Sequence, residues 1–279
     1  MDTNMMTRFS VLMSLYDGED PDYLDLALRS VFGQAPAPDQ VVLVLDGPVG
    51  AGLAAVVERY RAQYPALEVY PQAENRGLSA ALRVGLELCR NEIVFRMDTD
   101  DICYPDRYAR VLEAYEKDPS LEIVGTFATI IDEAGNETRL MRVPVTQEEI
   151  YRNVWTCPFI HPAVSFRKSA ILRIGSYNPA PGLRMDDYEL WFRCVEHGLR
   201  CVNLAEPTLY HRFFRNNLVK NNFRVAMARI RVFRRYARRC KCPAVAYLGV
   251  LYPLIRSCFP PFIRVWIYQL ADKFNPRSK

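Results

Sequence analysis

The first hundred residues repeat one unit, a short apolar run followed by a loop and a segment with helical spacing of apolar residues. Such repetition predicts a parallel sheet with right-handed helical crossovers. The predicted strands are 9–15, 40–45, 67–70 and the run that begins at residue 93, and the predicted helices are 21–32, 53–64 and 78–89. Residues 121–143 are rich in β-formers and indicate a small antiparallel or mixed addition. We therefore expect an α/β fold with a mostly parallel sheet flanked by helices.

Polar residues follow each of these predicted strands. They are Tyr16 and Glu19, Asp46, residues 75–77, and residues 98–101. Each group alone is ordinary in a turn or at a helix cap. The carboxyl ends of parallel strands share one sheet edge, so four such groups together predict a ligand crevice there.

The last of these groups contains three acids in four residues, Asp98, Asp100 and Asp101. In an extended segment, side chains two apart point the same way and lie roughly 6.6 Å from each other. Asp98 and Asp100 can therefore converge on one point, and a hard divalent cation is the usual partner of convergent carboxylates. The structural alternative is that Asp101 caps a helix near Pro105 and the other acids are solvated.

Two common phosphate-binding motifs are missing. No G-x-G-x-x-G follows the first predicted strand, which disfavours a dehydrogenase-type dinucleotide fold, and no G-x-x-x-x-G-K-[ST] is present. The eight cysteines include no C-x-x-C pair, which argues against a zinc ribbon and a disulfide framework. Residues 1–7 contain one acid and no basic residue, whereas a signal peptide begins with a positively charged segment. We therefore expect a cytosolic chain.

A second acidic pair, Asp186 and Asp187, stands in the first turn of a predicted helix. Acids there interact favourably with the helix dipole, which is a sufficient structural explanation. Upstream lies a loop with His161 between two prolines, followed by a predicted strand at 163–167.

Charge divides the chain into an acidic body and a basic tail. Residues 1–206 have a net charge of −11, and residues 207–279 have a net charge of +15. Apolar residues recur at helical spacing at positions 219, 223, 226, 230, 233 and 237. A basic amphipathic helix of this kind predicts binding to an anionic membrane surface. The alternatives are a helix packed on the body with solvated arginines, or nucleic-acid binding, although the body shows no nucleic-acid module.

From Phe9 to about Tyr210 the sequence resembles glycosyltransferase family 2, which has the GT-A fold, and in particular its bacterial exopolysaccharide and amylovoran-type branch. Six motifs in the right order carry the resemblance. They are Ser10-Val11-Leu12-Met13-Ser14 with Tyr16 and Glu19, Leu45-Asp46-Gly47-Pro48, Asn75-Arg76-Gly77-Leu78, Arg96-Met97-Asp98-Thr99-Asp100-Asp101-Ile102, His161-Pro162, and Asp186-Asp187-Tyr188-Glu189-Leu190-Trp191.

The resemblance implies roles for individual residues. Asp187 would be the general base, and Asp98 and Asp100 would hold a divalent metal, Mg²⁺ or Mn²⁺. Asp46 would hold the nucleotide base. The implied nucleotide-binding set is Ser14, Tyr16, Glu19, Asp46, Asn75, Gly77, Arg96 and Asp98. The implied acceptor side comprises His161, Asp186 and Trp191.

Three positions depart from the family pattern. Asp17 stands where relatives usually have Asn, and Asp186 stands where they usually have Glu. In relatives, a histidine often follows the Tyr-Arg segment, and this chain has Phe214 at that position. Phe214 cannot perform the role of that histidine, although His211 lies nearby.

We therefore predict a metal-dependent inverting glycosyltransferase with a nucleotide-sugar donor, UDP-linked, and a saccharide or lipid-linked acceptor. Residues 1–215 would form the GT-A domain, with a nucleotide-binding half at 1–104 and an acceptor half at 105–215. Residues 216–279 would form the membrane-associating tail of a cytoplasmic, peripheral protein with no nucleic-acid partner. The alternatives are a sugar-nucleotide nucleotidyltransferase, which would want a glycine-rich loop after the first strand, and an inactive membrane-surface binding protein.

Overall fold

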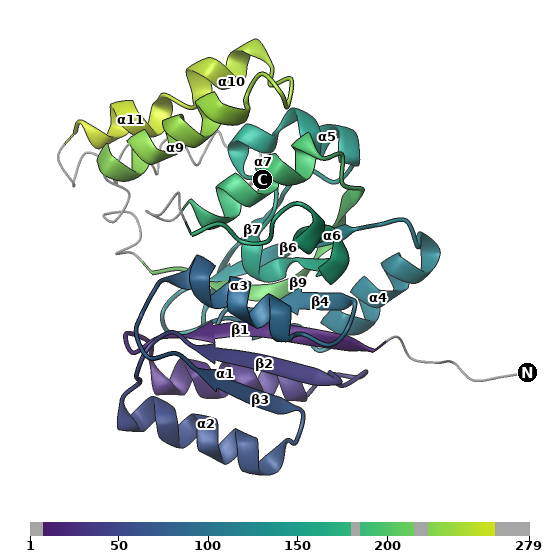
Figure 1. Cartoon of the computed structure of the whole chain (residues 1–279), viewed down its shortest axis with the longest axis vertical. Coiled ribbons are helices and arrows are strands. Elements are labelled where there is room, and N and C mark those ends of the chain that lie inside the picture. Colours follow the sequence, from purple (N-terminus) through teal and green to yellow (C-terminus); the bar gives the residue numbers. More distant parts are fainter. Residues whose placement is uncertain (1–7, 180–184, 215–222, 260–279) are drawn as a thin grey trace, which may run out of the picture.

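One mixed β-sheet organises the chain (Figure 1). The computed structural model describes residues 8–179, 185–214 and 223–259. Within these ranges the sheet has nine strands in the order β3-β2-β1-β4-β8-β6-β9-β5, and β7 pairs with β6. Residues 1–7, residue 219 and the apolar run 262–270 lie outside the described residues, so the expectations that involve them are not assessed.

The first half of the sheet is parallel, as the repeated pattern predicts. Its strands are β1 (Phe9–Leu15), β2 (Gln40–Leu45), β3 (Leu67–Pro71) and β4 (Ile93–Arg96), and its helices are α1 (Pro21–Phe32), α2 (Ala51–Gln63) and α3 (Leu78–Leu88). Alternate residues of each strand face opposite ways, so Leu12 and Val42 pack with α3, whereas Val11 and Val41 pack with α1 and α2. Burial on both faces explains why these strands are continuously apolar.

The second half of the sheet is mixed, which confirms the predicted addition. Its strands are β5 (Ile102–Cys103), β6 (Ile123–Ile131), β7 (Glu137–Met141), β8 (Ser165–Arg167) and β9 (Cys201–Arg212). Strand β8 runs antiparallel to both β4 and β6, and so joins the two halves, while β9 runs parallel to β6. The sequence pattern indicated β6 as two β-rich runs and did not indicate β9, whose polar and apolar residues do not alternate regularly.

Short helices cover the second half. They are α4 (Arg107–Lys117), α5 (Gln147–Arg152), α6 (Lys168–Arg173) and α7 (Asp186–Glu196), with 3-10 turns η1 (Val154–Thr156) and η2 (His161–Ala163). The expected strand at 163–167 is therefore shorter, because His161, Pro162 and Ala163 form η2. All eight cysteines are described and all are free, as their spacing predicts.

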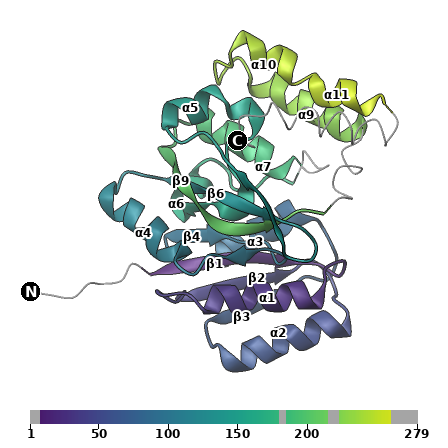
Figure 2. The same cartoon turned by 180° about the vertical axis from the view of Figure 1, so that it is seen from behind.

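The basic tail folds onto the body. It contains α9 (Phe223–Tyr236), α10 (Ala244–Gly249) and α11 (Tyr252–Ser257), and these helices lie beyond α7 at the end of the molecule away from α2 (Figures 1 and 2). Phe192 of α7 stacks on Tyr236, with 5.7 Å between ring centroids, and the Tyr236 hydroxyl donates to Glu189 at 2.7 Å. No described helix is both long and apolar enough to cross a bilayer.

This packing corrects the expected orientation of the α9 stripe. Ala226, Phe233 and Ala237 are buried, whereas a membrane-facing stripe would leave them exposed. Phe233 and Ala237 belong to the core that includes residues of α7 and α10. Phe223 is 53% exposed. The apolar spacing was therefore a core-packing signal at those three positions, because α7 offers an aromatic surface that the sequence pattern of α9 alone does not reveal.

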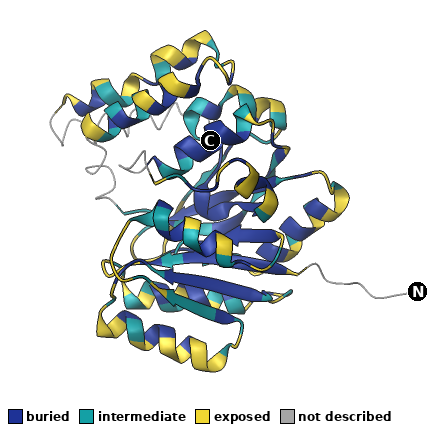
Figure 3. Cartoon of the chain, in the orientation of Figure 1, coloured by how far each residue is buried: buried dark blue, intermediate teal, exposed yellow. Residues whose placement is uncertain are grey.

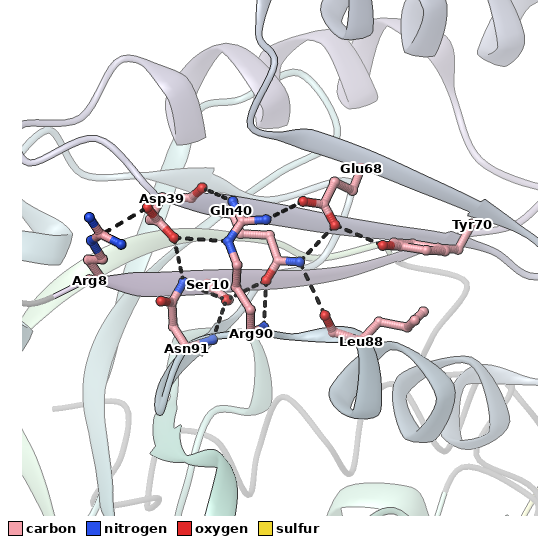
Figure 4. Close-up of polar contacts among 9 residues, drawn as sticks. All are labelled: Arg8, Ser10, Asp39, Gln40, Glu68, Tyr70, Leu88, Arg90 and Asn91. Atoms are coloured by element: carbon pink, nitrogen blue, oxygen red, sulfur yellow. Dashed lines mark hydrogen bonds and ion pairs between the residues drawn. The ribbon is translucent and has the colours of Figure 1, made fainter.

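A polar network closes the amino-terminal edge of the parallel strands (Figure 4). Ser10 donates to the Gln40 side chain at 2.7 Å, and Gln40 donates to Glu68 at 2.8 Å. Asp39 accepts from the Asn91 side chain at 3.0 Å and pairs with Arg90 at 3.1 Å. The network links β1, β2, β3 and the turn before β4, so it fixes the strand ends opposite to the edge where the polar loops gather.

We predict that Asp39→Asn makes the fold less stable at neutral pH by about 1 kcal/mol or less, because one carboxylate at a partly exposed site loses its charged partners. Hydrogen bonds from Asn91 and Arg90 lower the Asp39 pKa. A carboxyl group with a lowered folded pKa stabilises above its unfolded pKa of about 3.9 and loses that effect as pH falls through the folded pKa. Urea unfolding between pH 3 and 7 should therefore show a smaller acid-induced loss in Asp39→Asn than in wild type. The exposed control Glu116→Gln should leave stability at pH 7 unchanged, and identical pH profiles for Asp39→Asn and wild type would contradict the prediction.

Candidate functional site

The carboxyl-terminal edge of the parallel strands opens into a cavity of about 760 Å³. Its walls come from the start of α3, the end of β4, the segment that contains η2, the first turn of α7, and the end of β9. The lining residues are Arg76, Gly77, Leu78, Ser79, Arg96, Asp98, Met141, Cys157, Phe159, Ile160, His161, Pro162, Pro179, Asp186, Asp187 and His211. Of the predicted site residues, Gly77, Arg96, Asp98, His161, Asp186 and Asp187 are thus brought together.

The three acids that follow β4 form one cluster. Asp98, Asp100 and Asp101 each place a carboxylate oxygen within 4.8 Å of the others. Burial, and then the neighbouring charges of Asp101 and Asp98, raise the pKa of Asp100 to about 8. A divalent cation relieves the repulsion between crowded carboxylates, so the donor set fits Mg²⁺ or Mn²⁺.

Asp101 has a different role from its two neighbours. It is fully buried, accepts a hydrogen bond from the Arg212 backbone N–H at 2.8 Å and contacts His211 Nδ1 at 3.0 Å. The alternative that Asp101 caps the following helix is wrong, since α4 begins at Arg107 after Asp106. Asp101 instead ties the acidic loop to β9, while Asp98 and Asp100 stay partly exposed.

His211 balances part of the charge of this cluster. Although burial lowers the pKa of His211, the Asp101 carboxylate outweighs that effect and raises the pKa to about 9. His211 also lines the cavity. Phe214, at the position where the family often has histidine, instead lies 6.0 Å from Tyr23 between ring centroids. His211 is therefore the histidine that this chain places beside the acids.

Arg96 supplies a buried positive charge in the cavity wall. Its side chain is 2% exposed and pairs with Asp98. Its Nε and Nη1 atoms have no hydrogen-bond partner among the described residues. Unpaired donors on a buried guanidinium are costly, so these two are suited to an anionic or hydroxyl-bearing ligand in the cavity.

The loop after β1 contacts the acidic segment through Thr99. The Thr99 hydroxyl bonds to Glu19 and lies 3.4 Å from the Ser14 carbonyl oxygen. Burial raises the pKa of Glu19 to about 8 despite the hydrogen bond from Thr99. Tyr16 is 44% exposed beside this loop. Ser14, Tyr16 and Glu19 are absent from the cavity lining, and Ser14 and Glu19 contact the acidic segment through Thr99.

Asp46 shapes the loop that follows β3. Its carboxylate accepts from the backbone N–H groups of Arg76 and Gly77 at 2.8 and 2.9 Å. Gly47 has φ of +90°, and a Cβ there would lie 2.7 Å from the Asn75 nitrogen, so the Asp-Gly pair is required for this close approach. Asp46 and Asn75 lie outside the cavity lining, and Asp46 acts on it through Gly77.

Asp186 and Asp187 begin α7 at the opposite wall. Asp187 Oδ1 accepts from the Tyr188 N–H at 2.7 Å, and the Cys157 thiol donates to Oδ2 at 3.3 Å. Asp186 bonds to the Ser79 hydroxyl, and burial raises its pKa. The favourable interaction of acids in the first turn with the helix dipole is a sufficient local reason for Asp186 and Asp187 to begin α7. It does not explain why both also line the cavity, which is the feature expected of a functional pair.

The predicted acceptor side is partly buried. His161 lines the cavity, its Nε2 lies 3.0 Å from the Tyr177 hydroxyl, and burial together with Arg96 lowers its pKa well below 6.5. The ring is therefore neutral. Trp191 is fully buried, with its ring centroid 4.7 Å from that of Phe159, and does not line the cavity. It can therefore influence the cavity only through the residues against which it packs, such as Phe159.

Several residues of the site were missed from the sequence. Cys157 donates to Asp187, and Arg107 donates to the carbonyl oxygens of Arg96 and Pro162 at 2.8 Å each. Tyr177 contacts His161. No motif marks these residues, because each reaches the site through a long-range contact; the one available signal was the proximity of Cys157 to the His161 segment.

Comparisons with known proteins identify the family. The sequence model described as glycosyl transferase family 2 matches residues 10–175, more than half of the chain. The chain belongs to glycosyltransferase family 2. It is 40% identical over 199 residues to the amylovoran biosynthesis glycosyltransferase AmsE of Erwinia amylovora, covering 71% of this chain and 73% of that protein. It is 31% identical over 207 residues to the Escherichia coli UDP-Gal:alpha-D-GlcNAc-diphosphoundecaprenol beta-1,3-galactosyltransferase, covering 74% of each.

Solved structures confirm the GT-A fold of this family 2 chain. The mannosyltransferase PcManGT of Pyrobaculum calidifontis, in complex with GDP-Man and Mn2+, superimposes with a TM-score of 0.67 at 16% identity, over 98% of this chain and 82% of that one. S. aureus TarS 1-349 in complex with UDP gives a TM-score of 0.62 at 17% identity, over 81% and 65% of the two chains. The predicted family and its exopolysaccharide-type branch are thus confirmed, and glycosyl transfer follows from the family.

We predict opposite effects on stability from two acids of the cluster. Asp100→Asn removes one of three crowded charges, so it should raise the thermal unfolding midpoint in EDTA by about 2–4 °C per kcal/mol of relieved repulsion. A carboxyl group with a raised folded pKa loses stability as pH rises toward that pKa, so the gain should be larger at pH 8.5 than at pH 6.

The matched variant Asp101→Asn should instead lower the midpoint, because it removes the anionic acceptor of the Arg212 N–H and the charge beside His211. Scanning calorimetry of both variants in EDTA makes the comparison. A decrease for Asp100→Asn as large as that for Asp101→Asn would show that Asp100 is a structural acid.

Proposed function

We propose that this chain is a metal-dependent, inverting glycosyltransferase. It moves a sugar from a nucleotide-diphosphate donor, UDP-linked, to a surface polysaccharide or its lipid-linked precursor. One observation carries the proposal: a single cavity joins Asp98, from the acidic cluster after β4, to Asp187, at the first turn of α7. This arrangement would supply a cation site for the donor diphosphate at one wall and a proton acceptor at the other.

The donor would bind at the wall formed by the parallel strands. The nucleotide lies against the loops after β1, β2 and β3, where Tyr16, Asp46 and Asn75 stand, and Gly77 and Arg96 contact the part that enters the cavity. The unpaired guanidinium nitrogens of Arg96 support a polar or anionic ligand there. The UDP complex of the structural neighbour and the UDP-Gal donor in the name of the galactosyltransferase relative support a UDP-linked donor.

Asp98 and Asp100 would hold the divalent cation. When bound, such an ion neutralises the charge that builds on the departing diphosphate and orients the donor. Asp101 keeps the acidic loop in place through Arg212, and Arg96 keeps the Asp98 carboxylate oriented. The Mn2+ complex of the PcManGT neighbour supports this assignment.

Asp187 would take the proton from the acceptor hydroxyl as that hydroxyl attacks the sugar C1. Its carboxylate is fixed from two sides, by the Tyr188 N–H and by the Cys157 thiol, so it need not reorient during the reaction. Asp186 is already bonded to Ser79, which leaves Asp187 as the better placed base. One base and one in-line attack invert the configuration at the anomeric carbon.

His161 and Phe159 would line the path of the acceptor, with Trp191 packed behind them. The relatives act, by their names, in amylovoran biosynthesis and on a diphosphoundecaprenol-linked sugar. The second of these names supports a saccharide carried on a membrane lipid as the acceptor, and the first supports a surface polysaccharide as the product. The enzyme would therefore work as a peripheral protein on the cytoplasmic face of the membrane.

Asp187→Asn tests the proposal most directly. The change is nearly isosteric and removes the proton acceptor, so sugar transfer should fall by roughly 10²-fold or more with donor affinity little changed. The matched control is Asp186→Asn, on the same helix turn, which should lose less. Turnover is measured with a panel of UDP-sugars and membrane lipid extract as acceptor, and wild-type turnover by Asp187→Asn would remove Asp187 from the mechanism.

Asp100→Ala should abolish the metal-dependent part of UDP binding and leave the metal-independent part in place, because one of two proposed ligands is lost while the nucleotide contacts remain. Isothermal titration of UDP with Mg²⁺, with Mn²⁺ and with EDTA measures this difference. Glu116→Ala, an exposed acid on α4, is the control. Unchanged metal-dependent affinity in Asp100→Ala would place the cation elsewhere.

A further inference from the structure

Residues 244–259 present an apolar face to solvent. Val245, Leu248, Tyr252 and Ile255 are spaced by three, four and three residues along α10 and α11, and are 61, 73, 40 and 59% exposed. Leu251 is exposed beside them. We call these five side chains the α10–α11 face. The outward side of a helix on a water-exposed protein surface is normally polar, so this arrangement needs an explanation.

The opposite side of the same segment is already used for packing. Ala246 and Val250 are buried in the core that α7 and α9 share. A Cβ on Gly249 would lie 2.3 Å from the Trp155 ring, so α10 rests directly on that side chain. The Tyr247 ring lies 5.1 Å from Phe233 of α9. The segment is thus held in one orientation, and its exposed residues are not simply the frayed end of a chain.

Charge near this face has one sign. Between Glu206 and Asp272 the sequence contains no acid. The exposed basic residues of the described tail are Arg224, Arg231, Arg234, Arg235, Arg238, Arg239 and Lys241. Arg239 pairs with Glu196 of the body at 2.6 Å. Arg234 of α9 and Arg238, in the turn after α9, are both exposed. Figure 3 shows the exposed and buried sides of these helices alternating along the tail.

We propose that the α10–α11 face inserts into the interface of an anionic lipid bilayer, with the exposed arginines of α9 and Lys241 near the lipid headgroups. The stretch 244–255 is uncharged. Its 12 residues would measure roughly 18 Å as a helix, which suits a segment lying in the plane of the interface. Basic residues close to an anionic surface add an attraction that salt screens. The membrane-binding element is therefore α10–α11, not the stripe of α9 that the sequence first indicates.

This docking deepens the proposed function, and its relevance to catalysis rests on that proposal. Helix α9 packs on α7, and the first turn of α7 carries Asp187. A bilayer bound by α10–α11 would therefore be held at a fixed distance from the proposed base. A lipid-linked acceptor would then meet the cavity without leaving the membrane.

Vesicle flotation of the full chain tests the proposal without any substrate. Wild type should bind vesicles of phosphatidylcholine with phosphatidylglycerol far better than vesicles of phosphatidylcholine alone. Leu248→Asp with Ile255→Asp should reduce the partition coefficient roughly 100-fold, about tenfold for each apolar side chain that no longer enters the interface. The matched control is Leu26→Asp on α1, a leucine 38% exposed at the far end of the molecule, which should bind like wild type.

Arg234→Gln with Arg238→Gln should weaken binding at low salt and converge with wild type at high salt. The thermal midpoint and the rate of donor hydrolysis of every variant should match those of wild type. The flotation result then tests the membrane-binding surface, and donor hydrolysis separately tests the proposed catalytic function. Wild-type protein that ignores anionic vesicles, or a double aspartate variant that floats like wild type, would overturn the inference. So would a wild-type dimer that the double variant converts to monomer without any lipid binding, since the face would then belong to a second copy.

Discussion

The contact between Asp101 and the end of β9 is the interaction on which the site depends. Three acids within 4.8 Å repel each other, and the loop that carries them would open unless one were fixed from the other side. Asp101 is fixed by Arg212 and His211, 111 and 110 residues away. The contact joins the parallel half of the sheet to the mixed half at the point where ligands would enter. Because Asp101 joins the acidic loop to β9, Asp98 and Asp100 are not needed for that contact.

Buried arginines form a second layer of support under this loop. Arg107 donates to two backbone carbonyl oxygens and Arg96 pairs with Asp98, so both stabilise the acidic segment from inside the protein. Both have an unpaired nitrogen among the described residues, but only Arg96 also lines the cavity. The two residues therefore differ in function. One is committed to the fold, and the other retains donors for a ligand.

The tail shows the same division among its basic residues. Arg229 donates to the Trp155 carbonyl oxygen at 2.9 Å and lies 4.1 Å from the Tyr188 ring centroid, so it fastens α9 to α7. Among the exposed arginines farther along the tail, Arg239 pairs with Glu196 of α7, and Arg234 and Arg238 carry the charge that the membrane proposal tests. One stretch of sequence thus serves packing on one side and a surface on the other, which is why its amphipathic pattern admitted two interpretations.

The sequence by itself determined the alternating units of the parallel half, the acids at the end of β4, and the family, because these depend on local periodicity and on motifs of a few residues. The tertiary structure decided which of the predicted site residues are available to a ligand. Asp101 is committed by residues beyond position 210, Asp186 by Ser79, and Trp191 by burial under Phe159. It also decided that apolar side chains of α9 such as Phe233 are buried, whereas those of the α10–α11 face are exposed. These outcomes follow from contacts between segments far apart in the chain, and the spacing of residues within one segment carries no record of its partner.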